Sequence, residues 1–232
     1  MVSLQDWLID YVRAVQNAFS DRVLFIGIQG SRARGEANRT SDIDVVLILD
    51  TLSADDLKVY RDAIAALPDR ELMCGFVSGV GELRAWAPGE LFAFYYDTVP
   101  VMGSLDFLEP LFGARDVAQA VWSGACGVYH MAAHNCVHER SLDLLRELFK
   151  SAVFVLKAKW FLETGRHVSR RLELAEVLKG DDLKVLQTAN ALKDGQLCGE
   201  DALDVCTDLL LRWAGDLIRT MCAQEGTLES DG

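Results

Sequence analysis

The sequence has few of the features that mark membrane, secreted or nucleic-acid-binding proteins. No apolar run approaches the roughly 20 residues that a membrane-spanning helix needs, so no membrane association is expected. The six cysteines lie far apart without a Cys-x-x-Cys pair, and the N-terminus carries no secretory signal. We therefore expect a soluble, cytoplasmic protein with reduced thiols.

Basic residues are scarce as well. The chain has 23 Lys and Arg against 35 Asp and Glu, which gives a formal net charge of -12. General binding of nucleic acid needs clustered Lys and Arg for phosphate contacts, so this charge disfavours it. A small cationic partner suits an acidic chain better, although acidity also serves solubility.

Several common ligand-binding motifs are absent. The sequence has neither Gly-x-x-x-x-Gly-Lys nor Gly-x-Gly-x-x-Gly, and no stretch has the loop glycine and terminal glutamate of an EF-hand. Sites for phosphate or calcium that are built on these motifs are therefore excluded.

The spacing of apolar residues along the chain changes near residue 115. Before that point, apolar spacing and turn residues predict helices and short strands in alternation. The helices are predicted over 3–21, 53–68 and 80–86, and the strands over 22–30, 42–50, 71–79 and 90–103. Beyond it, long helical patterns predict a bundle, with helices over 116–141, 142–165, 170–178 and 200–224. The fold class expected is α+β, with a small mixed β-sheet domain over 1–115 and an α-helical bundle domain over 116–232.

Two aspartates and a Gly-Ser pair surround the connection between the first two predicted strands. Side chains alternate along a strand, so Asp42 and Asp44 point to one face as a possible ligand pair for a divalent cation. Mg²⁺ takes one or two carboxylates together with substrate phosphates, which implies a phosphate-bearing partner. Gly30 allows close approach of the backbone, and Ser31 offers a hydroxyl at the start of a short helix that can bind an anion. Each feature alone is more often structural, but the combination favours metal-assisted attack on a nucleotide's α-phosphate.

The order Gly-Ser, ten residues, Asp-x-Asp resembles the signature of the polymerase β-type nucleotidyltransferase superfamily. The helical second half is similar in layout to antibiotic-modifying members of the kanamycin type. The resemblance implies that Asp42 and Asp44 bind two catalytic Mg²⁺ ions and that Gly30 and Ser31 bind the β- and γ-phosphates of ATP or another nucleoside triphosphate. It also implies a third carboxylate on a later strand. Glu71 is the first candidate for it as catalytic and metal-binding residue, and Asp97 in the segment 90–103 is the second.

Further charged residues are candidates to complete the site. Arg32 and Arg34 lie between the phosphate loop and the aspartates and can neutralise triphosphate charge, with a solvated helix face as the alternative. Lys150 is the candidate of the second half to reach the triphosphate. Its neighbour Glu147 is a candidate general base, as the antibiotic-modifying relatives imply, with an exposed helix acid as the alternative.

Three histidines recur every four residues in the second half. His130, His134 and His138 form one stripe on a helix, with Cys126 one step earlier. On a straight helix the histidines spread over about 12 Å, too far to share one ion. Metal binding, substrate contact and packing all stay open for this stripe.

The sequence predicts a Mg²⁺-dependent nucleotidyltransferase that moves a nucleoside monophosphate, AMP from ATP in the first instance, to a hydroxyl of a small acceptor. The charge and the helical half favour a cationic, aminoglycoside-like acceptor. One alternative is a protein-adenylylating, antitoxin-like enzyme. Another is a non-catalytic nucleotide-binding sensor with an incomplete metal site. The acceptor, the nucleotide and the oligomeric state, including a homodimer, are left open.

Overall fold

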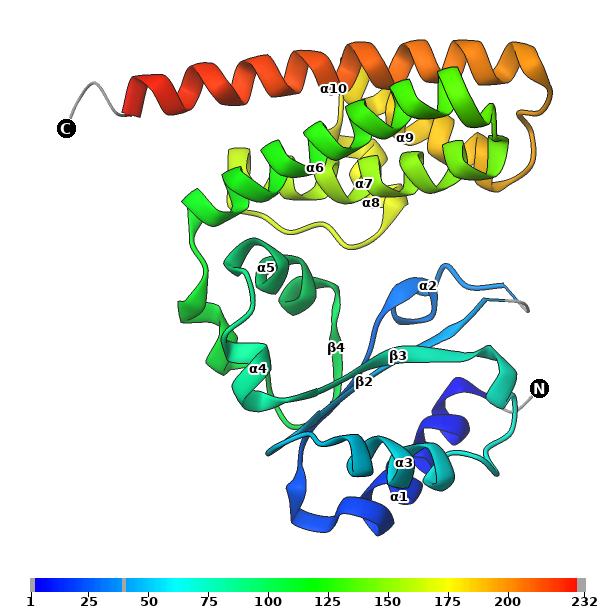
Figure 1. The fold of residues 1–232 in the computed structure, drawn as a ribbon, viewed down its shortest axis with the longest axis vertical. Helices are drawn as coiled ribbons and strands as arrows, with labels where there is room; N and C mark the ends of the chain where they lie inside the picture. The colour runs from blue at the N-terminus through cyan, green and yellow to red at the C-terminus, as the bar shows by residue number, and fades with distance from the viewer. Residues whose placement is uncertain (1–2, 39–40, 229–232) are drawn as a thin grey trace. The chain divides into compact units, whose positions relative to one another are not determined.

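The computed structural model describes residues 3–38 and 41–228, with side chains described as far as residue 223. The chain divides into two compact units, Met1–Phe112 and Gly113–Gly232. The first unit carries a four-stranded sheet with helices, and the second unit is helical (Figure 1). The α+β fold class predicted from the sequence is confirmed. Within the described ranges, no helix is both long and apolar enough to cross a membrane.

The sheet of the first unit is mixed. It consists of β1 (Val23–Ile28), β2 (Ile43–Leu49), β3 (Met73–Gly79) and β4 (Val99–Met102), in the spatial order β3-β2-β1-β4. β1 is antiparallel to both β2 and β4, whereas β2 and β3 are parallel. The end of β1 and the starts of the other three strands therefore share one end of the sheet, which we call the common end.

Two helices cover one face of this sheet, α1 (Leu4–Phe19) and α3 (Ala54–Ala63) (Figure 1). Trp7, Tyr11 and Val15 recur every four residues on α1 and are fully buried, as the amphipathic pattern predicts. The Tyr11 hydroxyl lies 2.9 Å from the hydroxyl of Tyr60 on α3, so the two helices share a buried polar contact. Ser3 caps the N-terminus of α1, where its hydroxyl accepts from the backbone N–H of Asp6.

The opposite face is covered by α4 (Val80–Arg84) and α5 (Pro88–Asp97) (Figure 1). Phe25, Val46 and Ile48 of the strands pack there with residues of α5. The predicted strand over 90–103 is wrong in its first part, because α5 runs to Asp97 and only Val99–Met102 is extended. Pro88 at the start of α5 suits the first turn of a helix, and Leu91 and Phe94, three residues apart, are buried on one side of it.

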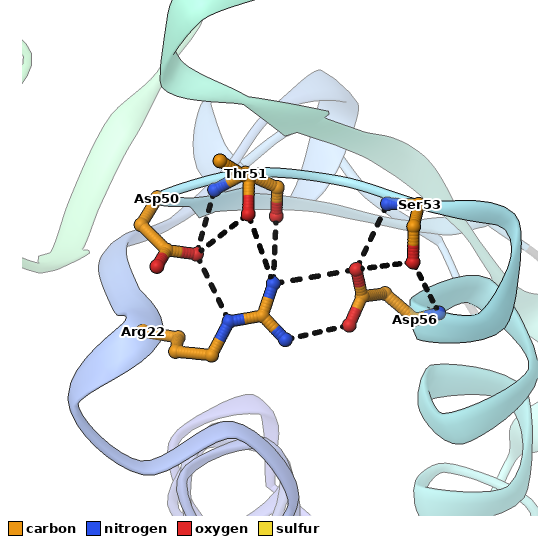
Figure 2. A network of polar contacts seen from close by, with 5 residues as sticks. All are labelled: Arg22, Asp50, Thr51, Ser53 and Asp56. Atoms are coloured by element: carbon orange, nitrogen blue, oxygen red, sulfur yellow. Dashed lines mark hydrogen bonds and ion pairs between the residues drawn. The ribbon is translucent and has the colours of Figure 1, made fainter.

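A network around Arg22 lies at the other end of the sheet (Figure 2). Arg22 ends the 3-10 turn η1 (Ser20–Arg22), and its guanidinium donates to Asp50 at 3.0 Å, to Asp56 at 2.6 Å and to the carbonyl of Thr51 at 3.0 Å. Asp56 also accepts from the backbone of Ser53, which caps α3. The hydrogen bond from Arg22 is the largest cause that holds the pKa of Asp56 well below its usual range. The network fixes the chain from β2 into α3.

As far as residue 228, the second unit contains five helices and a π-helical turn, η4 (Asn135–Glu139). The helices are α6 (Ala114–His134), α7 (Leu142–Thr164), α8 (Arg171–Val177), α9 (Gly180–Lys193) and α10 (Glu200–Leu228). α6 packs along both α7 and α10, and α9 packs on the same two helices. The helical character predicted for this half is confirmed, although the sequence pattern did not predict α9.

Candidate active site

Gly30 and Asp44 lie against each other at the common end of the sheet. The backbone N–H of Gln29 donates to the carbonyl of Asp44 at 2.8 Å, which extends the β1–β2 pairing by one residue beyond Ile28. Gly30 follows with a φ of 71°, in the left-handed region that favours glycine. A Cβ at this position would lie 2.9 Å from Cγ of Asp44 and would overlap its Oδ2. A glycine is therefore required for the Asp44 carboxylate to lie against this turn.

Asp42 and Asp44 share a face by alternation. Asp44 lies on the face that Val46 and Ile48 turn toward α4 and α5, and Asp42 directly precedes the strand. Asp42 is exposed and Asp44 is half-buried. Two hard oxygen donors beside a glycine turn fit Mg²⁺, which uses one or two carboxylates and leaves its other positions to substrate phosphates and water.

The Gly-Ser pair opens a single helical turn, α2 (Gly30–Ala33). Ser31 is half-buried, and its carbonyl accepts from the N–H of Glu36 at 2.8 Å, which folds the following residues back on the turn. The predicted short helix after the first strand is present. Ser31 directly follows the glycine that contacts Asp44.

The two arginines between the loop and the aspartates have protein partners. Arg32 donates through Nε and Nη2 to the carbonyl of Ser41, at 3.1 and 2.6 Å, and through Nε to the carbonyl of Asp42 at 3.0 Å. Arg34 pairs with Glu36 at 3.3 Å. Arg32 thus ties α2 to the backbone of Asp42 and helps to position that carboxylate. Triphosphate contact by either arginine stays a prediction.

Both candidates for the third carboxylate lie at the common end of the sheet. Glu71 is exposed in the 3-10 turn η2 (Arg70–Leu72) that precedes β3, and Asp97 is the half-buried last residue of α5 just before β4. On β3 the residue paired with Asp44 is Cys74, whose side chain is exposed. In the described part of the chain, no three His, Cys, Asp or Glu side chains are placed to hold one metal ion. The structure therefore does not gather Glu71 with Asp42 and Asp44, and the third ligand stays a prediction.

The remaining predicted site residues lie in the helical unit. Glu147 and Lys150 are one turn apart on α7, both exposed, and their side chains pair at 3.4 Å. Their catalytic roles stay predictions.

The histidine stripe runs from α6 into η4. The rings of His134 and His138 lie 4.8 Å apart, and His134 Nε2 lies 3.6 Å from a carboxylate oxygen of Glu139. His130 and Cys126 are exposed on α6. For the described residues, the stripe belongs to no group of three or more metal-binding side chains.

One pair of residues at the common end was not predicted. Nε2 of Gln29 donates to Oγ1 of Thr98 at 2.7 Å, across 69 residues of sequence. Gln29 directly precedes the Gly-Ser pair, which is the one sequence signal that points to it. Nothing in the sequence marks Thr98 as its partner.

Residues 10–71 match the family model described as a nucleotidyltransferase domain. They include Gly30, Ser31, Asp42 and Asp44 with the contact described above. This segment is a nucleotidyltransferase domain. The prediction that the protein is a nucleotidyltransferase is thereby confirmed.

The match to the family model ends at Glu71, before Asp97, Thr98 and the helical unit. Among solved structures, the chain resembles the crystal structure of spectinomycin adenyltransferase AAD(9) from Enterococcus faecialis with ATP and spectinomycin. The identity is 12%, the match covers 89% of this chain and 98% of that chain, and the TM-score is 0.54. At this identity the likeness shows the fold alone.

A second solved structure is described as a toxin-antitoxin with AMP-PNP. It is 17% identical over 50% of this chain and 86% of that chain, with a TM-score of 0.34, so it carries no argument. None of the curated proteins compared with the chain matches it significantly.

Proposed function

We propose that the chain transfers a nucleoside monophosphate, AMP from ATP in the first instance, to a hydroxyl group of a small acceptor. The contact between Gly30 and Asp44 carries this proposal, because it brings the Gly-Ser turn and the Asp pair of the nucleotidyltransferase domain to one place. In the reaction the acceptor oxygen forms a bond to the α-phosphorus and loses its proton. The bond between the α-phosphorus and the bridging oxygen breaks, and pyrophosphate leaves.

The residues at the common end supply distinct parts of this reaction. Asp42 and Asp44 would hold Mg²⁺, with Glu71 as first and Asp97 as second candidate for a third carboxylate. The metal, when bound, neutralises charge on the phosphates. Backbone N–H groups of the Gly30–Ser31 turn and the Ser31 hydroxyl donate to the β- and γ-phosphate oxygens, and no side chain at Gly30 blocks their approach.

The acceptor and the residues that bind it belong to the same proposal. The net charge of -12 favours a cationic acceptor, and the fold is shared with a spectinomycin adenyltransferase, which supports an aminoglycoside-like compound. Glu147 is the candidate general base for the acceptor hydroxyl. Lys150 is the candidate to pair with the triphosphate. Both side chains are exposed on α7, so each can be replaced without loss of packing.

Pyrophosphate release in the presence of ATP, Mg²⁺ and a panel of aminoglycosides and aminocyclitols tests the proposal. The double variant Asp42→Asn plus Asp44→Asn should lose on the order of 100-fold or more of the release, because it removes the carboxylate charge that holds the metal. The matched control is Asp10→Asn plus Asp62→Asn, which changes the same charge at two exposed positions on α1 and α3. Equal release from the two double variants would refute the proposed activity.

A nucleotide-binding sensor is the second candidate. It is favoured by the finding that, within the described residues, no three metal-binding side chains come together. Tight ATP binding that is indifferent to Mg²⁺, with no pyrophosphate release for any acceptor, would support the sensor over the transferase. Calorimetry with and without Mg²⁺ measures this.

A further inference from the structure

Gln29 is fixed through both its main chain and its side chain. Its backbone N–H donates to the carbonyl of Asp44 at 2.8 Å, and its side-chain Nε2 donates to Oγ1 of Thr98 at 2.7 Å. Thr98 is only 7% exposed and stands between α5 and β4. The residue that leads into Gly30 is therefore held from β2 on one side and from the end of α5 on the other.

The hydrogen bonds around Thr98 determine the orientation of the Gln29 amide. A threonine hydroxyl has one proton, and Thr98 donates it to the carbonyl of Phe94 at 2.5 Å. The same oxygen can then only accept from Gln29. The amide must present Nε2 and not its carbonyl oxygen to Thr98. A glutamate carboxylate, which has no proton to donate, cannot replace it there.

Few backbone contacts join the C-terminal end of β1 to β4. The pairing with β4 ends at Ile28 and Val99, and the previous pair joins Gly27 to Pro100, which has no N–H to donate. Gly27 also makes room for Thr98, because a Cβ at Gly27 would lie 2.7 Å from the Thr98 methyl group. The side-chain bond between Gln29 and Thr98 thus supplies a link that the backbone does not.

We propose that Gln29 is a positioning residue for the triphosphate. Thr98 fixes the Gln29 side chain, and Gln29 fixes the direction in which the chain enters Gly30 against Asp44. The inference rests on the proposed function and deepens it, because it makes the end of α5, outside residues 10–71, part of the nucleotide site. A looser turn weakens binding of the triphosphate and leaves the affinity for the acceptor unchanged.

Two substitutions at Thr98 separate the hydroxyl from the packing. Thr98→Val keeps the shape and removes the hydroxyl, whereas Thr98→Ser keeps the hydroxyl and removes the methyl group. The probe is α,β-methylene-ATP with Mg²⁺, measured by calorimetry, because the bond that the reaction breaks is blocked in it. A hydrogen bond contributes about 1 kcal/mol net, so we expect Thr98→Val to weaken binding roughly fivefold. Thr98→Ser should stay within about twofold of the wild type.

Substitutions at Gln29 test the other partner. Gln29→Leu should match the loss of Thr98→Val in nucleotide binding. The double variant Gln29→Leu plus Thr98→Val should lose no more affinity than either alone, because Thr98 acts on the turn through its bond to Gln29. In turnover, KM for ATP should rise while KM for the acceptor stays constant. If Thr98→Val does not fold, the comparison of Gln29→Met with the wild type decides the question, since methionine is similar in length, makes no such hydrogen bond and adds no charge beside the phosphates.

The outcomes distinguish this inference from the function on which it rests. Normal Mg²⁺-dependent binding with equal affinities for Thr98→Val and Thr98→Ser, or losses at Gln29 and Thr98 that add, would overturn the inference alone. Nucleotide binding that ignores Asp42→Asn plus Asp44→Asn would overturn the proposed function and this inference together. Thermal unfolding of each variant confirms that the affinities compare folded proteins.

Discussion

Replacing Gly30 by alanine tests the contact on which the candidate site depends. Two costs are expected at this position. The backbone has a φ of 71°, where a residue with a Cβ costs roughly 1–2 kcal/mol. The new methyl group would also overlap Oδ2 of Asp44, and forcing extra atoms into a packed place typically costs about 1–3 kcal/mol. Together, Gly30→Ala should lower the free energy of unfolding by roughly 2–5 kcal/mol unless Asp44 moves aside.

Gly35→Ala is the matched control, because the two glycines differ in only one of these costs. Gly35 has a φ of 70°, and a Cβ there would meet nothing within 4 Å. The backbone cost of roughly 1–2 kcal/mol therefore applies to both variants. The difference between them isolates the contact with Asp44.

The two variants are compared with the wild type by urea unfolding and by Mg²⁺-dependent ATP binding. A displaced Asp44 carboxylate should reduce nucleotide affinity or turnover in Gly30→Ala by roughly 100-fold, as misplacement by about 1 Å does in other sites. Gly35→Ala should change either quantity by only a few fold. Equal losses in the two variants, in stability and in nucleotide binding, would show that the contact between Gly30 and Asp44 is not what the function needs.

Three further outcomes follow from the polar contacts of the first unit. Arg32→Lys should reduce nucleotide affinity several-fold in calorimetry, since one ammonium cannot replace the forked donors that hold the backbone of Asp42. Wild-type nucleotide affinity in an Arg32→Gln variant would contradict this. The pKa of Asp56 lies below its usual value in the folded state, so the stability that its carboxylate contributes is present above about pH 4 and is lost as the pH falls below that value. Urea midpoints measured at decreasing pH below about 4 should therefore fall less steeply in Arg22→Gln than in the wild type. Tyr60→Phe should lower the free energy of unfolding in urea by about 1–3 kcal/mol, because it leaves the hydroxyl of the fully buried Tyr11 without its partner. The double variant Tyr60→Phe plus Tyr11→Phe removes both hydroxyls. If the single variant loses no more stability than the double variant, an unsatisfied Tyr11 hydroxyl is not the cause.

The part of the fold that sequence predicts well is the part set by local pattern. The helix that presents Trp7, Tyr11 and Val15 and the strands of Phe25 and Val46 carry periodicities that each segment shows by itself. The Gly-Ser pair and the Asp pair are joined by a short connection, so their spacing alone indicates that they meet.

The segment from 90 to 103 shows where local pattern fails. Its aromatic and β-branched residues favour a strand, but Leu91 and Phe94 are spaced for a helix that buries them against the sheet. Pro88 fits the first turn of that helix. Both patterns were present, and packing on Val46 and Ile48 decides between them.

The third carboxylate shows a second kind of limit. Glu71 belongs to the same apolar run as β3, but Asp69 adopts a φ of 53° and the chain turns through η2 before the strand begins at Met73. A shift of two residues at a strand start changes which side chain lies beside Asp44, and sequence does not fix such boundaries. The sequence cannot predict the hydrogen bond between Gln29 and Thr98 for a different reason, because that contact depends on how β4 pairs with β1.

The pairing of β1 with β4 also bears on the order in which the chain folds. β1 and β2 are close in sequence and form a hairpin. The contact between Gln29 and Thr98 instead joins residues 69 positions apart, with α2, β2, α3, β3, α4 and α5 between them. Closing a long loop costs more entropy and is slower than forming a local hairpin. We therefore expect the Gly-Ser turn to acquire its final geometry late in folding. A ligand that needs this geometry would stabilise the finished domain while leaving the early hairpin unaffected, so it would slow unfolding more than it speeds folding.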